Sequence, residues 1–162
     1  MATGIKVFAP ASVANLACGY DILGLALERP GDEIIIRKTD GKGLKINKIF
    51  GADRKLPTDI HKNTAGLAAY ALLKSVDRIG EGIEMDIYKK MPSGSGLGSS
   101  AASAAAAVWG INALLDLRLT KRELLHFAVL GEQAADGSYH ADNVAPSLMG
   151  GIIFIRDNES LD

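Results

Sequence analysis

The sequence predicts an α+β domain in which a mixed, mostly antiparallel sheet packs against helices. Segments that alternate apolar and polar residues crowd the first fifty positions, whereas helical periodicity dominates after residue 63. Strands that gather before the helices favour this architecture over a doubly wound parallel sheet. We expect one domain, because 162 residues with 48% hydrophobic content can bury one sizeable core.

The first part of the chain supplies four candidate strands. Residues 4–9 and 22–28 are rich in apolar residues, and the intervening residues 10–21 are expected to form a loop. Residues 32–39 and 44–50 alternate apolar with polar side chains, and the turn-like sequence DGKG separates them. This spacing predicts a β-hairpin.

Helical periodicity begins at Asn63 and ends at Gly80. One apolar stripe runs through this segment, and Asn63 has the residue type of an N-cap. Residues 82–90 then alternate in the manner of a half-buried strand, which Pro92 stops. The sequence therefore predicts a helix followed by a strand.

The last part of the chain is mainly helical. Residues 101–117 predict a long helix of small residues, and we expect its alanine-rich start and Trp109 to pack against the sheet. Residues 120–136 predict another helix. A turn or short helix at 140–151 and a strand at 151–157 complete the pattern.

Composition excludes several classes of function. The formal net charge is −1, so no overall basic field attracts nucleic acid or an anionic membrane. The single cysteine, Cys18, excludes an intrachain disulfide framework, and no stretch reaches the roughly 18 apolar residues of a membrane span. We expect a soluble, cytoplasmic protein without nucleic-acid or membrane partners.

The segment SGSGLGSS at 93–100 is the most informative in the chain. Its three glycines let the backbone turn tightly and bring N–H groups close to a ligand. Ser99 and Ser100 stand at the start of the following helix, where free N–H groups and the positive end of the dipole attract an anion. The spacing is neither that of a P-loop nor GxGxxG. A flexible surface loop that caps a helix is the plain alternative.

The segment PSGSGLGSSAAS at 92–103 resembles the second signature motif of the GHMP kinase superfamily. The resemblance implies that residues 1–162 are the amino-terminal, ATP-binding domain of such a kinase, with a ribosomal-protein-S5-like fold, and that the family's carboxy-terminal domain is absent from this chain. In that family the loop wraps the phosphates of ATP, and Asn63 lies near the adenine. The implied nucleotide-binding residues are Asn63, Pro92, Ser93, Gly94, Ser95, Gly96, Leu97, Gly98, Ser99 and Ser100.

Two further segments resemble motifs of homoserine kinases, one family within that superfamily. They are APASVANLACGYDILGLAL at 9–27 and GEQAADGSYHADNVAPSLMGG at 131–151. The resemblance implies that Asn15, Asp21, His140 and Asn143 bind the amino-acid substrate. A carboxylate at position 21 suits an ammonium group and is a candidate for polarising the substrate hydroxyl.

Glu132 lies in the helix predicted at 120–136, beside apolar neighbours that indicate a mostly buried setting. A buried acid is costly unless it is paired or binds a cation. Alone it could equally be an exposed glutamate of a helix surface. The resemblance implies that Glu132 and the Ser100 hydroxyl hold Mg²⁺ together with phosphate oxygens, which are the ligands magnesium prefers.

Several of these polar residues also have purely structural interpretations. Asp142 or Asn143 could cap the next short helix, and Asn63 could be only an N-cap. Asn15 could be a turn residue and Asp21 a strand cap. These alternatives stay open at the level of the sequence.

The resemblance implies transfer of the γ-phosphoryl group of ATP to the hydroxyl of L-homoserine, which gives O-phospho-L-homoserine, a step toward threonine. Glu132, Ser100 and Asp21 would be its catalytic residues. Ser12 stands where several relatives carry a lysine, so no general base is predicted. We expect the 162-residue chain alone to be weakly active or inactive, and a homodimer is one assembly it allows. A GHMP kinase for another small alcohol, a noncatalytic nucleotide-binding module and an interaction domain are the alternatives.

Overall fold

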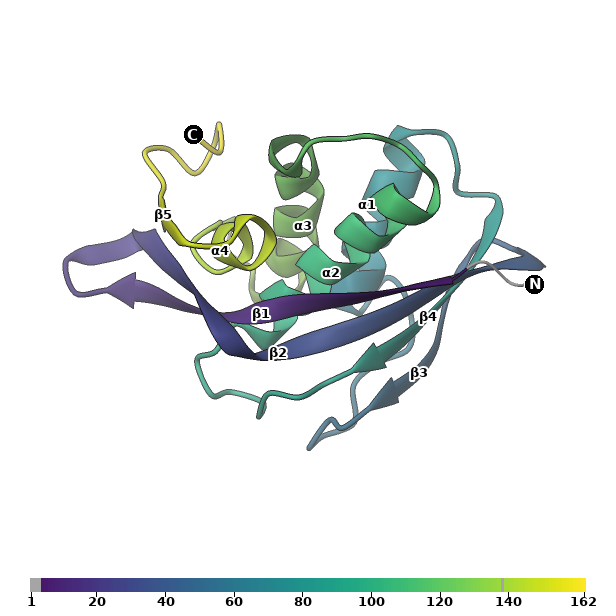
Figure 1. The fold of residues 1–162 in the computed structure, drawn as a ribbon, viewed down its shortest axis with the longest axis horizontal. Helices are drawn as coiled ribbons and strands as arrows, with labels where there is room; N and C mark the ends of the chain where they lie inside the picture. Colours follow the sequence, from purple (N-terminus) through teal and green to yellow (C-terminus); the bar gives the residue numbers. More distant parts are fainter. Residues whose placement is uncertain (1–3, 138) are drawn as a thin grey trace.

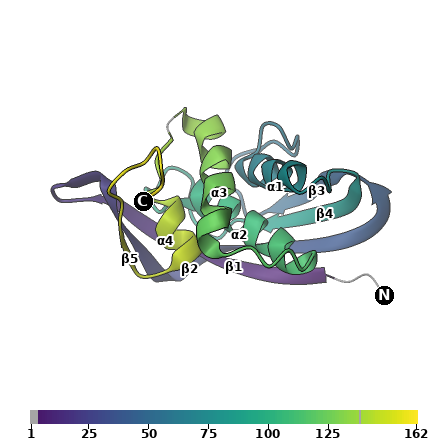
Figure 2. The ribbon, with the colours of Figure 1, turned by 90° about the horizontal axis from the view of Figure 1, so that it is seen from above.

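The structure, a computed structural model, describes residues 4–137 and 139–162. Along the chain its elements are β1 (Gly4–Leu16), β2 (Gly19–Lys42), β3 (Leu44–Phe50), α1 (Thr64–Ser75), β4 (Glu81–Tyr88), α2 (Ser99–Leu114), α3 (Lys121–Asp136), α4 (Val144–Met149) and β5 (Ile152–Phe154). The helices form one layer over a single face of the sheet (Figure 1), which confirms the predicted α+β architecture. Seen from above, α3 lies between α4 and α1, and α2 passes beneath them against the sheet (Figure 2).

β1 and β2 form one long antiparallel hairpin, so the prediction of a loop at residues 10–21 is wrong. Asn15 and Asp21 have φ values of 57° and 59°, in a left-handed region that Asn and Asp tolerate better than most residues. The Asn15 Oδ1 atom accepts a hydrogen bond from the Asp21 backbone N–H at 2.8 Å. Residues that look like loop formers therefore shape the tip of a hairpin. β2 also merges the two strands expected at 22–28 and 32–39.

The hairpin expected between residues 32–39 and 44–50 is also wrong. The strand order is β1-β2-β4-β3, so β4 lies between the two and pairs antiparallel with β2 and parallel with β3. α1 makes the crossover that a parallel pair requires. In keeping with its place inside the sheet, most residues of β4 are buried, whereas most residues of the edge strand β3 are not. The sheet is thus mixed and mostly antiparallel, as predicted.

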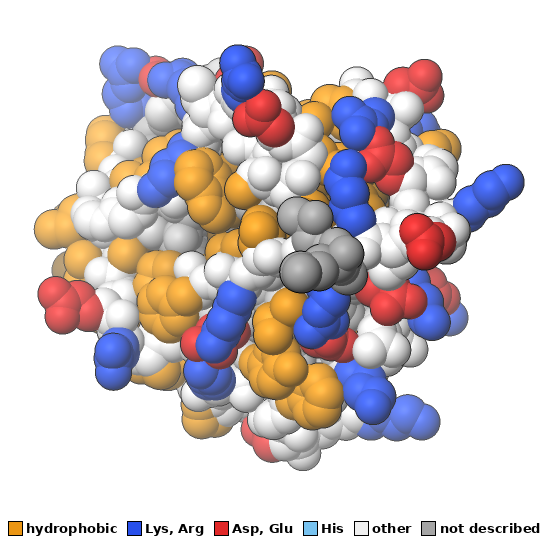
Figure 3. Space-filling model, turned by 45° about the vertical axis from the view of Figure 1, so that its right-hand side comes forward, with side chains coloured by type: hydrophobic (Ala, Val, Ile, Leu, Met, Phe, Trp, Pro, Cys, Tyr) orange, Lys and Arg blue, Asp and Glu red, His pale blue; other side chains and the backbone are white. Residues whose placement is uncertain are grey.

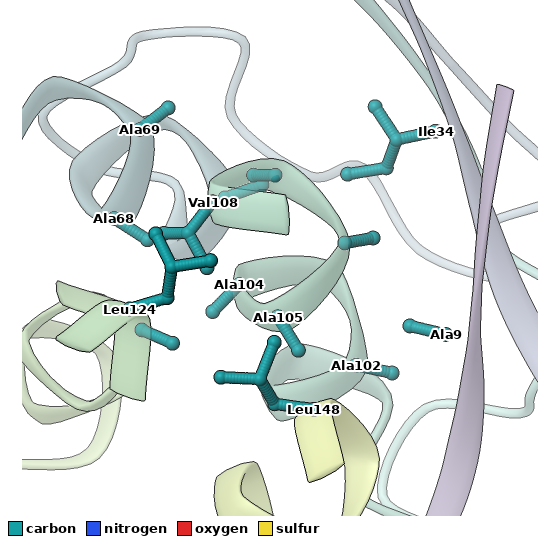
Figure 4. Packing of buried hydrophobic residues seen from close by; sticks show 14 of the residues in the cluster. Ala9, Ile34, Ala68, Ala69, Ala102, Ala104, Ala105, Val108, Leu124 and Leu148 are labelled. Atoms are coloured by element: carbon teal, nitrogen blue, oxygen red, sulfur yellow. The ribbon is translucent and has the colours of Figure 1, made fainter. Parts of the chain in front are cut away.

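α2 is the centre of the core. Its small residues lie between Ala9 and Ile34 of the sheet and the apolar side chains of the neighbouring helices (Figure 4). At Gly110 a Cβ atom would stand 2.4 Å from the Ile36 Cδ1 atom, so the helix needs a glycine to approach the sheet there. Trp109 lines a surface pocket beside Val7 and Ala9 of β1. It is 38% exposed, and the Lys121 ammonium lies 5.6 Å from its ring centroid.

Three helices begin in different ways. The Asn63 side chain accepts hydrogen bonds from the Ala65 and Gly66 backbone N–H groups, which confirms it as the N-cap of α1. Thr120 and Glu123 form a capping box at α3. α2 instead follows Gly98, which has no side chain to cap it. The first N–H groups of α2 are therefore left for other acceptors.

The sheet face that the helices leave uncovered carries paired charges. The Glu33 carboxylate lies 2.8 Å from the ammonium nitrogens of both Lys6 and Lys90, and the Arg37 Nη1 atom lies 2.6 Å from the Asp86 Oδ2 atom. On the face shown in Figure 3, Lys and Arg side chains are interspersed with Asp and Glu. Among the described residues, no helix combines the length and the apolar content needed to span a bilayer.

Candidate active site

A cavity of about 650 Å³ opens between the glycine-rich loop, the chain that leads into α1, and α3. The loop follows β4 and ends at α2, so two rigid elements hold its ends. All ten predicted nucleotide-binding residues line this cavity together with Glu132. They are Asn63, Pro92, Ser93, Gly94, Ser95, Gly96, Leu97, Gly98, Ser99 and Ser100.

The loop has the backbone of an anion-binding turn. Gly94, Gly96 and Gly98 have φ values of 70°, 74° and 63°, which side-chain-bearing residues rarely adopt. The Ser12 backbone N–H donates to the Leu97 carbonyl oxygen at 3.1 Å and thereby ties the loop to β1. Successive N–H groups in such turns, at the positive end of a helix, attract negative charge.

Ser100 and Glu132 meet at the wall of the cavity. The Ser100 hydroxyl donates to the Glu132 Oε1 atom at 2.5 Å, which joins the first turn of α2 to α3. Glu132 is largely buried, and its Oε2 atom is inaccessible to solvent, which agrees with the mostly buried setting expected for it. A hydroxyl and a carboxylate at this distance form a pair of hard oxygens of the kind that Mg²⁺ accepts beside phosphate.

Asp53 holds the start of the loop, a role that sequence reasoning missed. Its carboxylate accepts a hydrogen bond from the Ser93 backbone N–H at 3.0 Å and another from the Ser93 hydroxyl. These hydrogen bonds lower the pKa of Asp53 below its usual range. Arg54 and Lys62 from the same segment line the cavity and supply positive charge. The cluster ADRK at 52–55 is the signal that could have drawn attention to it.

Lys89 is a second lining residue that sequence reasoning missed. Burial lowers the pKa of its ammonium group, and the nearby carboxylates of Asp32 and Glu132 partly offset this effect. Asp32 itself is fully buried. The available signal was its place in β2, where it shares the core-facing side with Ile34 and Ile36.

Three of the predicted substrate-binding residues come together at the tip of the β1–β2 hairpin. The His140 Nδ1 atom lies 3.3 Å from the Asp21 Oδ1 atom. Asn15 orients Asp21 through the backbone hydrogen bond described above, and the Asn158 side chain donates to the Asp21 carbonyl oxygen at 3.0 Å. Both the turn interpretation of Asn15 and a polar cluster are therefore consistent with the geometry.

Asn143, the fourth, adjoins the glycine-rich loop. It is the N-cap residue of α4, but its side chain makes no capping hydrogen bond. Its Oδ1 atom accepts a hydrogen bond from the buried Ser12 hydroxyl at 2.8 Å. A Cβ atom at Gly98 would lie 2.2 Å from that hydroxyl oxygen and 2.9 Å from the Asn143 Oδ1 atom. Asn143 thus connects the polar cluster to the cavity wall. Ser138, in the same motif, lies outside the described residues.

Asn63 has a structural role that is already complete. Besides capping α1, its amide nitrogen donates to the Pro57 carbonyl oxygen at 3.0 Å, and the residue is 8% exposed. Its side chain therefore shapes the cavity wall by fixing the chain before α1. A contact with adenine would have to come in addition to these bonds.

Asp142 should make stability depend on pH. Burial, and secondarily the charge of Asp21, raises the pKa of its carboxyl group. A raised folded-state pKa gives stability that is present below the ordinary value and lost as the pH rises through the folded value. We expect Asp142→Asn to gain in free energy of unfolding relative to wild type as the pH increases from about 4 to about 8. Urea unfolding across this range measures the gain.

The control for Asp142→Asn is Asp40→Asn, which neutralises an exposed carboxylate of the same type. Its difference from wild type should stay nearly constant over the same range. Parallel curves for Asp142→Asn and wild type would contradict the effect ascribed to burial.

Comparison with known proteins identifies related sequences. Homoserine kinase from Chlorobium phaeovibrioides is 45% identical over 98% of this chain and 52% of its own length. Homoserine kinase from Methanococcus vannielii is 43% identical, again over 98% of this chain and 52% of its own length. The chain therefore spans about half the length of these relatives.

Solved structures agree with this relationship. A crystal structure of homoserine kinase from Cytophaga hutchinsonii matches with a TM-score of 0.93 and 51% identity over 98% of this chain and 50% of that chain. The mevalonate kinase of Methanococcus jannaschii matches with a TM-score of 0.75 at 17% identity, over 96% of this chain and 54% of that chain, which concerns the fold alone. Residues 63–151 match the family described as GHMP kinases N terminal domain. The chain therefore belongs to the GHMP kinase family through its N-terminal domain.

Proposed function

We propose that this chain is the amino-terminal, ATP-binding half of a homoserine kinase, which transfers the γ-phosphoryl group of ATP to the side-chain hydroxyl of L-homoserine and gives O-phospho-L-homoserine, a step toward threonine. The observation that carries the proposal is the contact between Ser100 and Glu132 at the start of α2, in the wall of a cavity lined by the whole glycine-rich loop. The names of the relatives supply the substrate.

In this proposal the loop and the first turn of α2 bind the phosphates. The phosphates would be bound by backbone N–H groups from the turns at Gly94, Gly96 and Gly98 and by the positive end of α2. These groups would take the place of the lysine that the motif lacks. Arg54 and Lys62 add positive charge at the wall nearer α1. We assign the adenine to this wall, next to Asn63.

The donors present fit a magnesium ion. Ser100 and Glu132 would hold it, since their oxygens already lie 2.5 Å apart and Mg²⁺ needs few protein ligands beside substrate phosphates. When bound, the ion neutralises charge on the phosphates and helps to orient them.

The homoserine end is assigned to the polar cluster beside the loop. Asp21 offers a carboxylate for the ammonium group, and His140 and Asn143 offer nitrogen donors for the carboxylate. The Ser12–Asn143 hydrogen bond places this cluster next to Gly98, at the wall of the cavity.

Catalysis in this arrangement depends on positioning and on charge stabilisation. Phosphoryl transfer gains most from in-line placement of the two substrates and needs little covalent help from the protein. Asp21 is the residue that would polarise the acceptor hydroxyl. No side chain of the described cluster is assigned the role of a general base.

A substrate panel with the full-length protein tests the proposal. We expect MgATP-dependent phosphorylation of L-homoserine at least about tenfold more efficient, as kcat/KM, than that of mevalonate or galactose, because only homoserine carries the ammonium group that Asp21 would bind. The 162-residue chain alone should turn over weakly or not at all. A preference for an alcohol without the amino-acid group would instead indicate another GHMP kinase.

Binding measurements separate the noncatalytic alternatives. A nucleotide-binding module would bind MgATP with no effect of homoserine, and an interaction domain would show a melting temperature independent of nucleotide. The proposal also includes a cytoplasmic location and, as the assembly to test first, a homodimer.

A further inference from the structure

A buried ion pair lies directly beneath the first turn of α2. The Lys89 ammonium is 2.5 Å from the Asp32 Oδ2 atom, with exposed side-chain fractions of 10% and 0%. Asp32 belongs to β2, and Lys89 follows the end of β4. Neutral residues of similar size often replace a buried ion pair without loss of stability, so stability alone does not account for this one.

The hydrogen bonds of the pair converge on Ser99. The Ser99 hydroxyl donates to the Asp32 Oδ2 atom at 2.7 Å, and the Lys89 ammonium donates to the Ser99 carbonyl oxygen at 2.8 Å. The same ammonium donates to the Ser103 hydroxyl oxygen at 2.8 Å, one turn further along α2. Asp32 also accepts a hydrogen bond from the Lys90 backbone N–H at 2.8 Å, which fixes the chain that enters the loop.

Lys89 has no donor to spare for a nucleotide. An ammonium group has three N–H donors, and here Asp32, Ser99 and Ser103 accept them. The Ser99 hydroxyl is likewise turned to Asp32, so only the backbone of Ser99 is left for a phosphate. We therefore expect the pair to hold the loop through its hydrogen bonds to Ser99 and to the Lys90 backbone, without a contact to the nucleotide.

We propose that Asp32 and Lys89 are positioning residues, which lock Ser99 and both ends of the glycine-rich loop so that the first turn of α2 is preorganised for a nucleoside triphosphate. The next residue after Ser99 is Ser100, whose hydroxyl meets Glu132, so a shift of this turn displaces that contact as well. The inference rests on the ATP site of the proposed function and does not depend on which alcohol accepts the phosphate.

The test is the double substitution Asp32→Asn with Lys89→Met in the full-length protein. It removes both charges and keeps the approximate volume of the pair. We expect the Kd for MgATP, measured by calorimetry, to rise about tenfold or more, as is usual when groups that orient a binding site are removed. The KM for homoserine should change less than about twofold and the melting temperature by only a few degrees.

A matched control is available on β2 and β4 themselves. Arg37 and Asp86 form an ion pair at 2.6 Å on the opposite face of the sheet, with exposed side-chain fractions of 36% and 9%. The double substitution Arg37→Met with Asp86→Asn should leave the Kd for MgATP within about twofold of wild type. An equal loss of MgATP affinity in both double variants would reduce the Asp32–Lys89 pair to a general structural role and overturn the proposal.

If the double variant does not fold, Ser99→Ala makes the same test, because it removes the hydrogen bond from the first turn of α2 to Asp32 and leaves the Asp32–Lys89 ion pair intact. An unchanged Kd for MgATP in the folded variant would overturn the positioning role, even if wild type phosphorylates homoserine. Normal MgATP binding by wild type without turnover of homoserine would contradict the proposed substrate only. Failure of wild type to bind MgATP would overturn both.

Discussion

Replacing Glu132 by glutamine should lower kcat/KM for homoserine phosphorylation at least about 100-fold, which corresponds to roughly 3 kcal/mol of transition-state stabilisation. The amide keeps the size of the side chain and an oxygen that the Ser100 hydroxyl can meet, but it removes the negative charge that would hold Mg²⁺. Steady-state kinetics in the full-length protein at increasing Mg²⁺ should show that the variant needs more metal for half of its maximal rate.

Glu159→Gln is the control for Glu132→Gln, because it makes the same chemical change at an exposed position. It should keep wild-type kinetics at every Mg²⁺ concentration. A Glu132→Gln enzyme with the Mg²⁺ dependence and the rate of wild type would show that the residue is no metal ligand, and the contact with Ser100 would then be structural.

Gly98→Ala should destabilise the protein by about 2–5 kcal/mol and abolish MgATP binding. The left-handed conformation at φ 63° costs an alanine about 1–2 kcal/mol, and overpacking adds about 1–3 kcal/mol. The overpacking arises because the new methyl group would lie 2.2 Å from the Ser12 hydroxyl oxygen and 2.9 Å from the Asn143 Oδ1 atom. Urea unfolding measures the first effect and calorimetry the second.

Gly94→Ala separates the two contributions to the Gly98 effect. Its φ value of 70° imposes the same backbone strain, but a Cβ atom there meets no atom within 4 Å. We expect a loss of only about 1–2 kcal/mol in the free energy of unfolding. Equal losses in the two variants would contradict the contact of Gly98 with the Ser12–Asn143 hydrogen bond.

Local signals explain what could be predicted from the sequence. The three glycines, the serine pair and the N-cap Asn63 act within a few residues of their own positions, so the loop, the start of α2 and the cap of α1 follow from composition and spacing. The α+β class also follows, because the order of strands and helices is visible in the periodicity. Glu132 was identified only through resemblance.

Contacts across long stretches of chain could not be predicted in this way. Ser93 meets Asp53 over 40 residues, and Ser99 meets Asp32 over 67 residues, so no local pattern marks either pair. The prediction of the strand order was wrong for a related reason. The sequence DGKG marks a change of direction, but β2 pairs with β4, which β3 and α1 separate from it in the chain, so no local pattern marks this pairing.

The close packing of α2 has a mechanical consequence. A helix of 16 residues is about 24 Å long, and the N-terminal end of α2 supports the glycine-rich loop. A bulkier residue at a buried alanine such as Ala104 or Ala105 would displace the first turn of α2, because the sheet and the neighbouring helices leave the helix no room to bend. Substitutions in the middle of α2 should therefore lower the affinity for nucleotide even when the domain remains folded.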